Sequence, residues 1–311
     1  MIQTKDWVML AAIFGAMLVS ILWPQAGAPF SPYLVVFMMV LLFLSFLSLP
    51  IGSIVRAARG YGLRLCGWVV LKLLILPVGL FYLTRAIAPD YALTALLLGG
   101  ISSGVVSPFF STLLKANTAL VIMMVTETSI LVPFTLPVLV RTLAGQTLVI
   151  SLPAMVRLLA QVIFAPLIAA ELVRFLSSRA AERISRNHYV LSLALCVAII
   201  LGVVSRYADF FYHKPSVILE AILVSVVLAV FSFGAGALAS LGQPPGDRLA
   251  GIISFGLINN ILVVVFSSEF FGPLEPLVAM VYCVPFFGSI VFLRAYAAWL
   301  QKGLDGAKVY R

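Results

Sequence analysis

The sequence predicts an all-α integral membrane protein with ten transmembrane helices. Hydrophobic residues make up 63% of the 311 residues, charged residues only 10%, and the mean hydropathy is +1.16. No soluble domain could bury that much apolar surface, so we expect most of the outer surface to face the lipid bilayer. Because apolar segments run along the whole sequence, we expect residues 1–311 to form a single membrane domain.

Ten apolar segments carry this prediction, and most have the ~20 residues that a helix needs to cross the ~30 Å hydrocarbon core. The first has no small-residue cleavage site behind it, so it is typical of a first span and not of a signal peptide. The connections are short and contain Gly, Pro and charged residues. The segments are residues 7–23, 32–50, 64–86, 91–114, 118–140, 154–176, 188–205, 216–240, 249–268 and 276–300.

The basic residues predict the orientation. With ten spans, 14 of the 20 Lys and Arg residues fall on the side of the two termini, five fall on the other side, and Lys72 belongs to neither. Such a bias places both termini in the cytoplasm of a multi-pass protein of the cell (inner) membrane. The net charge of +9 therefore reflects cytoplasmic loops, and we expect no nucleic-acid partner. The 14 are Lys5, Arg56, Arg59, Arg64, Lys115, Arg174, Arg179, Arg183, Arg186, Arg248, Arg294, Lys302, Lys308 and Arg311.

A short motif occurs twice, at matching places in the two halves of the sequence. Residues 101–108 read Ile-Ser-Ser-Gly-Val-Val-Ser-Pro, and residues 253–260, 152 positions later, read Ile-Ser-Phe-Gly-Leu-Ile-Asn-Asn. The halves 1–145 and 146–311 each hold five spans, so the second half enters the membrane from the opposite side. The sequence therefore predicts two inverted repeats whose broken fourth and ninth helices meet near the membrane midplane.

Breaks of this kind are candidate binding sites. They free backbone groups, which is tolerable only inside protein or beside a wet cavity, and the half-helix N-termini favour an anion. Small-residue helix packing with Ser and Asn as interhelical hydrogen-bonding groups is the alternative. The candidate substrate-binding residues are Ser102, Ser103, Gly104, Ser107, Pro108, Ser254, Gly256, Asn259 and Asn260.

Two ionisable residues, Lys72 and Glu127, lie deep in apolar sequence, each ~12–15 Å from the cytoplasmic face. An unpaired charge at that depth costs several kcal/mol, so each needs a partner or a neutral state. Equal depth makes a Lys72–Glu127 pair possible, and a purely structural ion pair is the alternative. Thr126 and Thr128 flank Glu127, and we include all four as candidate coupling residues.

Other chemistry has little support. Cys66, Cys196 and Cys283 all fall inside apolar segments without metal-ligand spacing, and no Walker motif, nucleophile elbow or zinc motif occurs. We therefore expect no enzyme, no cofactor and no metal centre.

In the order and spacing of these motifs, the sequence resembles the bile acid:sodium symporter family. The matching stretches are 31–34, 72–77, 99–137 and 254–260. The resemblance implies ten spans, inverted repeats and crossed, broken fourth and ninth helices. It also implies a panel domain of spans 1, 2, 6 and 7, a core domain of spans 3–5 and 8–10, and organic anions as substrates.

The departures from this family concern sodium. By the resemblance, a sodium-binding Gln falls on Lys72, a Glu on Ser254, a Gln on Ile258 and an Asn near Pro108, while Asn259 matches. The family's hydroxyl positions in span 5 fall on Val121 and Val125. We therefore hypothesise that Lys72 acts as a tethered cation in place of sodium, with Glu127 or carbonyls of the crossing as its partner.

The sequence thus favours a secondary transporter of a small organic anion that works without sodium, by uniport, by exchange or linked to protons. One alternative is a proton-linked cation or metalloid exchanger, although span 4 has no Cys and neither break has an Asp. The other is a membrane scaffold or sensor that does not transport. The sequence sets no oligomeric state.

Overall fold

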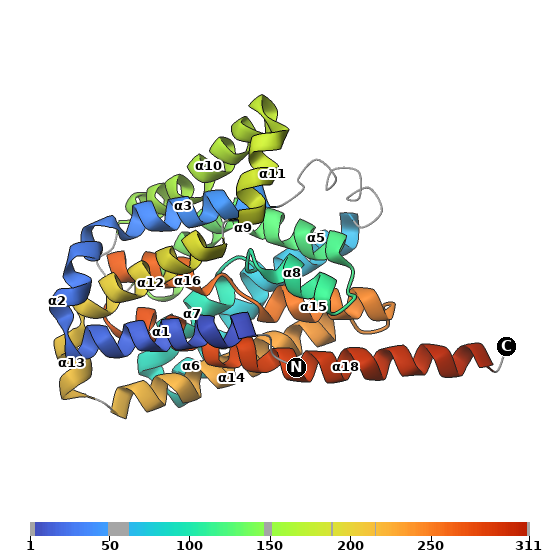
Figure 1. The fold of residues 1–311 in the computed structure, drawn as a ribbon. Coiled ribbons are helices and arrows are strands. Elements are labelled where there is room, and N and C mark those ends of the chain that lie inside the picture. Colours follow the sequence, from blue (N-terminus) through green and yellow to red (C-terminus); the bar gives the residue numbers. More distant parts are fainter. Residues whose placement is uncertain (1–3, 49–61, 146–150, 188, 215, 310–311) are drawn as a thin grey trace.

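The computed structural model describes residues 4–48, 62–145, 151–187, 189–214 and 216–309. Within these ranges the protein is helical, with one isolated β-bridge as the only extended pairing (Figure 1). The predicted all-α class is therefore confirmed. Arg56, Arg59, Arg311 and the predicted repeat boundary at 146 lie outside the described residues, as do the side chains of Lys5, Arg186, Lys302 and Lys308.

Each of the ten expected segments has a helical counterpart, and seven helices are long and apolar enough to cross a membrane. Two further apolar helices, Ala11–Leu22 and Asn260–Phe270, are shorter. The elements are α1 (Thr4–Leu22), α2 (Pro24–Gly27), η1 (Ala28–Tyr33), α3 (Leu34–Leu47), α5 (Gly62–Val70), η2 (Leu71–Ile75), α6 (Leu76–Ile87), η3 (Pro89–Tyr91), α7 (Ala92–Gly100), α8 (Ser107–Leu113), α9 (Thr118–Leu143), α10 (Leu152–Leu176), α11 (Ser178–Asn187), α12 (Tyr189–Arg206), α13 (Ala208–His213), α14 (Ser216–Ala239), α15 (Pro245–Gly256), α16 (Asn260–Phe270), α17 (Leu274–Val281) and α18 (Cys283–Val309).

Both predicted breaks are present. The segment 91–114 divides into α7 and α8, and the segment 249–268 divides into α15 and α16. Two irregularities were not predicted from sequence. The helix containing Lys72 has a π-helical turn, η2, between α5 and α6, and the last span is divided at Tyr282 into α17 and α18.

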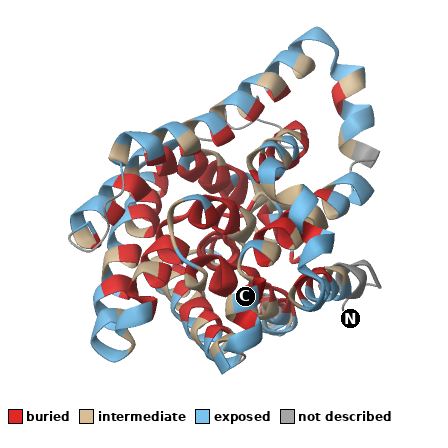
Figure 2. Ribbon diagram, turned by 90° about the vertical axis from the view of Figure 1, so that its left-hand side faces the viewer, coloured by how far each residue is buried: buried red, intermediate tan, exposed pale blue. Residues whose placement is uncertain are grey.

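The helices pack in two sets of neighbours. In one set α1, α3, α10 and α12 are joined by contacts, and in the other α5–α9 and α14–α18 are, while α9 and α10, consecutive in sequence, pack closely against each other across the two sets. Small residues permit the close approaches in both sets. A Cβ at Gly27 would overlap the carbonyl oxygen of Leu201, and one at Gly236 would lie 2.6 Å from that of Gly251. Buried residues fill the middle of the assembly, and exposed residues cover its outer faces (Figure 2).

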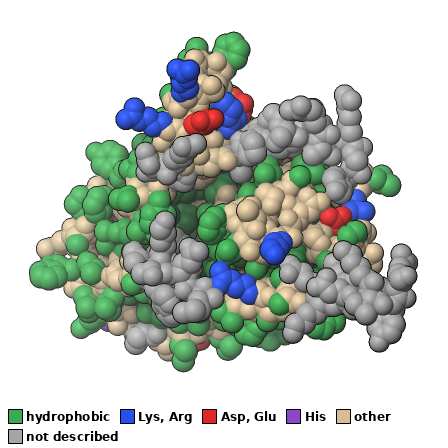
Figure 3. Space-filling model, turned by 45° about the vertical axis from the view of Figure 1, so that its right-hand side comes forward, with side chains coloured by type: hydrophobic (Ala, Val, Ile, Leu, Met, Phe, Trp, Pro, Cys, Tyr) green, Lys and Arg blue, Asp and Glu red, His purple; other side chains and the backbone are tan. Residues whose placement is uncertain are grey.

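The outer surface is largely apolar, as a lipid-facing surface requires. Hydrophobic side chains cover much of the face in Figure 3, whereas basic and acidic side chains gather at the tip near α11. Large exposed hydrophobic residues occur on most helices and include Leu22, Ile87, Phe175, Leu223 and Phe292. These helices and this surface support a multi-pass membrane protein.

A buried carboxylate fixes the start of α15. Asp247 accepts hydrogen bonds from Arg64 Nη1 at 2.6 Å and from Asn117 Nδ2 at 2.8 Å. Asn117 also caps α9, because its Oδ1 accepts from the amide of Leu120. The network therefore ties α5, α9 and α15 together at the end of the molecule from which α15 runs toward the break.

Candidate functional site

The two breaks cross and pair through their backbones. The amide of Gly104 donates to the carbonyl of Leu257 at 2.7 Å, and the amide of Asn259 donates to the carbonyl of Ser102 at 3.0 Å. Ser103 and Ile258 form an isolated antiparallel bridge between these bonds. Gly104 is required here, since a Cβ would lie 2.8 Å from the carbonyl oxygen of Ile258. Two stretches 152 positions apart in sequence are thus joined inside the protein.

Hydroxyl groups satisfy the remaining backbone groups that the breaks release. In a continuous helix the amide of Ser103 would donate to Gly99, but it donates instead to Thr128 Oγ1 at 3.0 Å. Ser103 Oγ donates to the carbonyl of Ser254 at 2.6 Å, and Ser107 Oγ donates to that of Leu257 at 3.1 Å. Ser103, Ser107 and Thr128 therefore hold the crossing together.

The other residues predicted in the breaks also have structural roles, at the ends of the helices that flank the breaks. Asn259 is the N-cap of α16, and its Oδ1 accepts from the amide of Leu262. Pro108 lies in the first turn of α8, where a missing N–H costs no helical hydrogen bond. Gly256 ends α15 against the ring of Phe233, and Asn260, which is half-buried, begins α16.

Two hydroxyls at the crossing have no partner among the described residues. Ser102 Oγ and Ser254 Oγ are fully buried and make no hydrogen bond. A buried hydroxyl without a partner is costly and uncommon in folded proteins. Both belong to the repeated motif, one from each half. The crossing thus presents two free hydroxyls that a solute or a water molecule can engage.

Lys72 lies at the end of α7, next to the crossing. Its side chain is 0% exposed, and Nζ donates to the carbonyl of Gly99 at 3.0 Å. That carbonyl is free because the amide of Ser103 has turned to Thr128. The C-terminal carbonyls of a helix carry partial negative charge, which favours a cation. The π-helical turn η2 surrounds Lys72, and such turns are frequent at functional sites.

The possible pair between Lys72 and Glu127 does not form. Both residues are described, no ion pair joins them, and Glu127 is exposed on the face of α9 opposite to the buried Val125, Thr128 and Ser129. Equal depth did not fix the direction in which each helix points its side chain, and a helix turns by about 100° per residue. Thr126 is also turned aside, with Oγ1 donating to the carbonyl of Ile122. Of the three residues predicted in α9, only Thr128 contacts the crossing.

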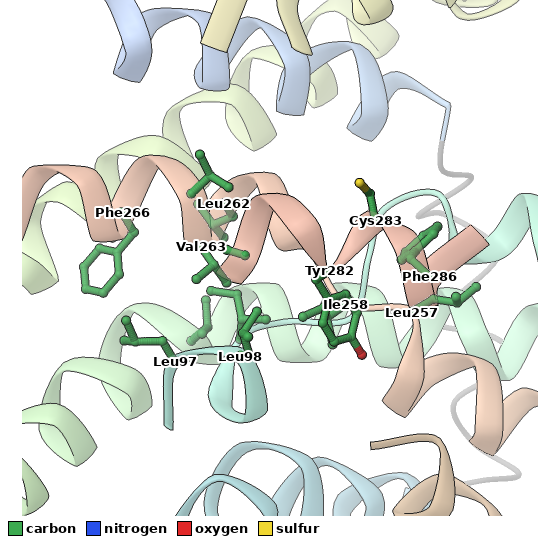
Figure 4. Packing of buried hydrophobic residues seen from close by; sticks show 14 of the residues in the cluster. Leu97, Leu98, Leu257, Ile258, Leu262, Val263, Phe266, Tyr282, Cys283 and Phe286 are labelled. Carbon is green, nitrogen blue, oxygen red and sulfur yellow. The ribbon is translucent and has the colours of Figure 1, made fainter. Parts of the chain in front are cut away.

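Sequence reasoning missed Tyr282, which engages the end of α15. Its hydroxyl donates to the carbonyl of Gly256 at 2.9 Å, and the residue is fully buried. Figure 4 shows it in the same apolar layer as Leu257, Ile258 and Leu98. A tyrosine inside an apolar span needs a hydrogen-bond partner for its hydroxyl. This requirement could have identified Tyr282 as a candidate residue from the sequence.

Comparison with known proteins identifies the family of the chain. A model of the "Sodium Bile acid symporter family" matches residues 28–214, which is more than half of the chain. The chain belongs to the sodium bile acid symporter family. A curated relative is the "Uncharacterized sodium-dependent transporter YocS" of Bacillus subtilis (strain 168), which is 22% identical over 281 residues, covering 89% of this chain and 85% of the relative.

The resemblance to the sodium bile acid symporter family implies sodium-ligand positions at Val121, Val125, Ser254 and Ile258, and the structure shows the surroundings of each. Val121 and Val125 are fully buried and have no oxygen atom in their side chains. Ile258 is buried in the crossing, and Ser254 offers a hydroxyl in place of a carboxylate. The ends of α7 and α15, where carbonyls could receive a cation, already accept hydrogen bonds from Lys72 and Tyr282.

Proposed function

We propose that this protein is a secondary transporter that carries a small organic anion by alternating access and does not use sodium. Membership of the sodium bile acid symporter family supports transport. The observation that carries the sodium-free proposal is the hydrogen bond from Lys72 to Gly99, which puts an ammonium where a broken helix would otherwise offer its C-terminal carbonyls to an ion.

The architecture that we propose has ten spans in two inverted repeats, with residues 1–145 and 146–311 in one membrane domain. The panel consists of α1, α3, α10 and α12, and the core consists of the helices from α5 to α9 and from α14 to α18. The two sets of neighbouring helices support this division. Both termini lie in the cytoplasm in this proposal, as the 14 basic residues on that side indicate.

Two observations support the absence of sodium. A sodium ion in a site of this kind needs several oxygen ligands, and the carbonyls of Gly99 and Gly256 are engaged by protein donors. A fully buried ammonium also repels a second cation at short range in a medium of low dielectric constant. The name of the Bacillus relative speaks of sodium dependence for that protein, whereas we propose sodium independence for this chain.

The proposed substrate is an anion because of the groups that the crossing leaves available. Ser102 and Ser254 supply two unpartnered hydroxyls, and α16 begins at Asn260, in the same break as Ser254. Hydroxyl donors and a helix N-terminus together favour a carboxylate or a similar group. We therefore assign Ser102, Ser254 and Asn260 to substrate binding, with Ser103, Gly104, Ser107, Pro108, Gly256 and Asn259 shaping the site.

Uptake into proteoliposomes tests the proposal, with labelled pyruvate and labelled taurocholate as a small and a large probe. We expect flux of at least one probe to be unchanged when choline replaces sodium, and to be lost in Lys72→Ala but kept in the matched control Glu127→Gln. Strict dependence on sodium contradicts the tethered-cation proposal. Folded protein that transports no organic anion in a wider screen favours the scaffold alternative.

A further inference from the structure

Glu275, which the proposed mechanism does not use, is a buried carboxylate whose hydrogen-bonding partner in the described structure is its own backbone amide. Of the acidic side chains that the structure describes, only Asp247 and Glu275 are buried, at 8% and 7% exposed. Asp247 is bound by Arg64 and Asn117. No hydrogen bond or ion pair connects the carboxylate of Glu275 to another described residue. One acidic group in the described part of the chain is therefore buried and unpaired.

The cost of this arrangement decides the protonation state. An ionised carboxylate that is removed from water without a partner costs several kcal/mol, and the group avoids the cost by binding a proton. Glu275 lies in the first turn of α17, where the helix dipole favours negative charge by up to about 1 kcal/mol. This smaller effect does not offset the loss of water, so we infer that Glu275 is protonated in this conformation.

Glu275 lies close to the contact between the two sets of helices. Helix α17 packs against α7, α14, α16 and α18 of the proposed core, and also against α12 of the proposed panel. At the end of α12, Tyr207 is within electrostatic range of Glu275 and donates to the carbonyls of Ser268 and Phe271, both at 3.3 Å. Separation of α12 from α16 and α17 would break these contacts and expose the carboxyl.

The charged groups around this end of α17 leave Glu275 unpaired. From α12, Arg206 pairs with Glu269 of α16 at 2.9 Å and also donates to Ser31. From η3 and α14, Tyr91 donates to Glu220 at 3.0 Å. On the side of α18, Cys283 lies at the opposite end of α17. Each of these charges is thus engaged elsewhere, and no ion pair joins a described Lys or Arg to the carboxylate of Glu275.

We propose that Glu275 is the proton-binding site that couples transport of the anion to a proton gradient, an inference that rests on the proposed transport function. With the contact to α12 closed, the carboxyl is neutral. When this contact opens, water reaches the carboxyl, the O–H bond breaks, and the proton passes to bulk water and leaves a carboxylate. Gly272 provides a short path, because it is exposed and its Cβ position lies 3.9 Å from Glu275 Oε2. Each cycle then moves one proton with one anion.

Infrared difference spectroscopy of the reconstituted protein tests the protonation directly and needs no substrate. At neutral pH we expect a protonated-carboxyl band in the wild type and in the control Glu182→Gln, whose side chain is exposed on α11 outside the membrane spans. The band should be lost in Glu275→Gln and return in Glu275→Asp. A band that is unchanged in Glu275→Gln, or absent from the wild type, overturns the proposal.

Transport under an imposed pH gradient tests the coupling, again with labelled pyruvate and taurocholate. Wild type and the control Glu182→Gln should accumulate a probe when the donor side is more acidic, whereas Glu275→Gln should lose accumulation and keep exchange across equal pH. Accumulation that persists in Glu275→Gln contradicts the coupling role. If no variant transports a probe while the band still depends on Glu275, the transport proposal fails and the buried proton site stands.

Discussion

The phenol of Tyr282 donates a hydrogen bond of 2.9 Å to the carbonyl of Gly256, the last residue of α15. The same carbonyl also accepts from the amide of Ile258 at 3.2 Å, so it keeps one partner when the phenol is removed. A polar donor in the apolar interior of the second half of the chain therefore fixes the end of a broken helix.

Tyr282→Phe should lower the free energy of unfolding by about 1 kcal/mol, since it removes one buried hydrogen bond and leaves the carbonyl partly satisfied. Thermal unfolding in detergent measures the change. The control is Tyr82→Phe, because Tyr82 is 55% exposed and makes no side-chain hydrogen bond in the described structure. Equal melting temperatures for the two variants would show that the Tyr282 bond contributes nothing.

Lys72→Met should separate stability from transport. Methionine keeps the length of the side chain and removes an ammonium that has a single acceptor, so the melting temperature should equal or exceed that of the wild type. Transport should fall by at least about tenfold, because no cation then remains at the end of α7. If transport survives in a folded Lys72→Met protein, the ammonium does not replace an ion.

Gly104→Ala should disrupt the crossing of the breaks. The added Cβ would lie 2.8 Å from the carbonyl oxygen of Ile258 and 2.9 Å from that of Leu257, both of which are backbone atoms that cannot rotate away. Overpacking of this kind costs about 1–3 kcal/mol. Gly79→Ala is the matched control in α6, since nothing lies within 4 Å of its Cβ position. Thermal unfolding of both variants should separate them, and similar values would argue against a rigid crossing.

Glu269→Gln should loosen the contact between α12 and α16 with little effect on overall stability. Both side chains of the Arg206–Glu269 pair are about one-third exposed, so the pair contributes about 0–1 kcal/mol. Hydrogen exchange of the amides at the end of α12 and around residue 271 should accelerate by up to about fivefold. Glu171→Gln, whose partner Arg174 lies on the same helix, should leave these amides unchanged.

The fold could be predicted in outline because hydropathy marks membrane helices strongly. The two breaks were also predictable, since Gly and small polar residues recur at matching places in otherwise apolar segments. The pairing of Gly104 with Leu257 and of Asn259 with Ser102 gives these breaks their geometry. The π-helical turn at Lys72 and the division of the last span at Tyr282 depend on packing between helices, which hydropathy does not contain.

The side chains at the site could be predicted only in part. Lys72 stood out because a lysine is rare in such a segment. Of the two partners expected for it, Glu127 or a carbonyl of the crossing, the structure shows a carbonyl, that of Gly99. Glu127 stood out equally but points outward, since depth along a helix leaves the direction of a side chain undetermined. Glu275 follows Gly272 and Pro273 at the start of a helix, a place where acidic residues are common, so its burial could not be inferred from sequence.

The crossing of the two breaks is joined chiefly by main-chain atoms, and this has a consequence for how such a protein changes over time. Leu257 and Ser102 contribute carbonyls and Asn259 contributes an amide, groups that other residues can also supply (except proline for the amide), whereas the position of Gly104 has no room for a Cβ. Mutations that alter the hydroxyls of Ser102 or Ser254 can therefore accumulate without unravelling the centre of the molecule. A lineage can exchange one coupling ion for another, or one solute for another, while the same polypeptide framework persists.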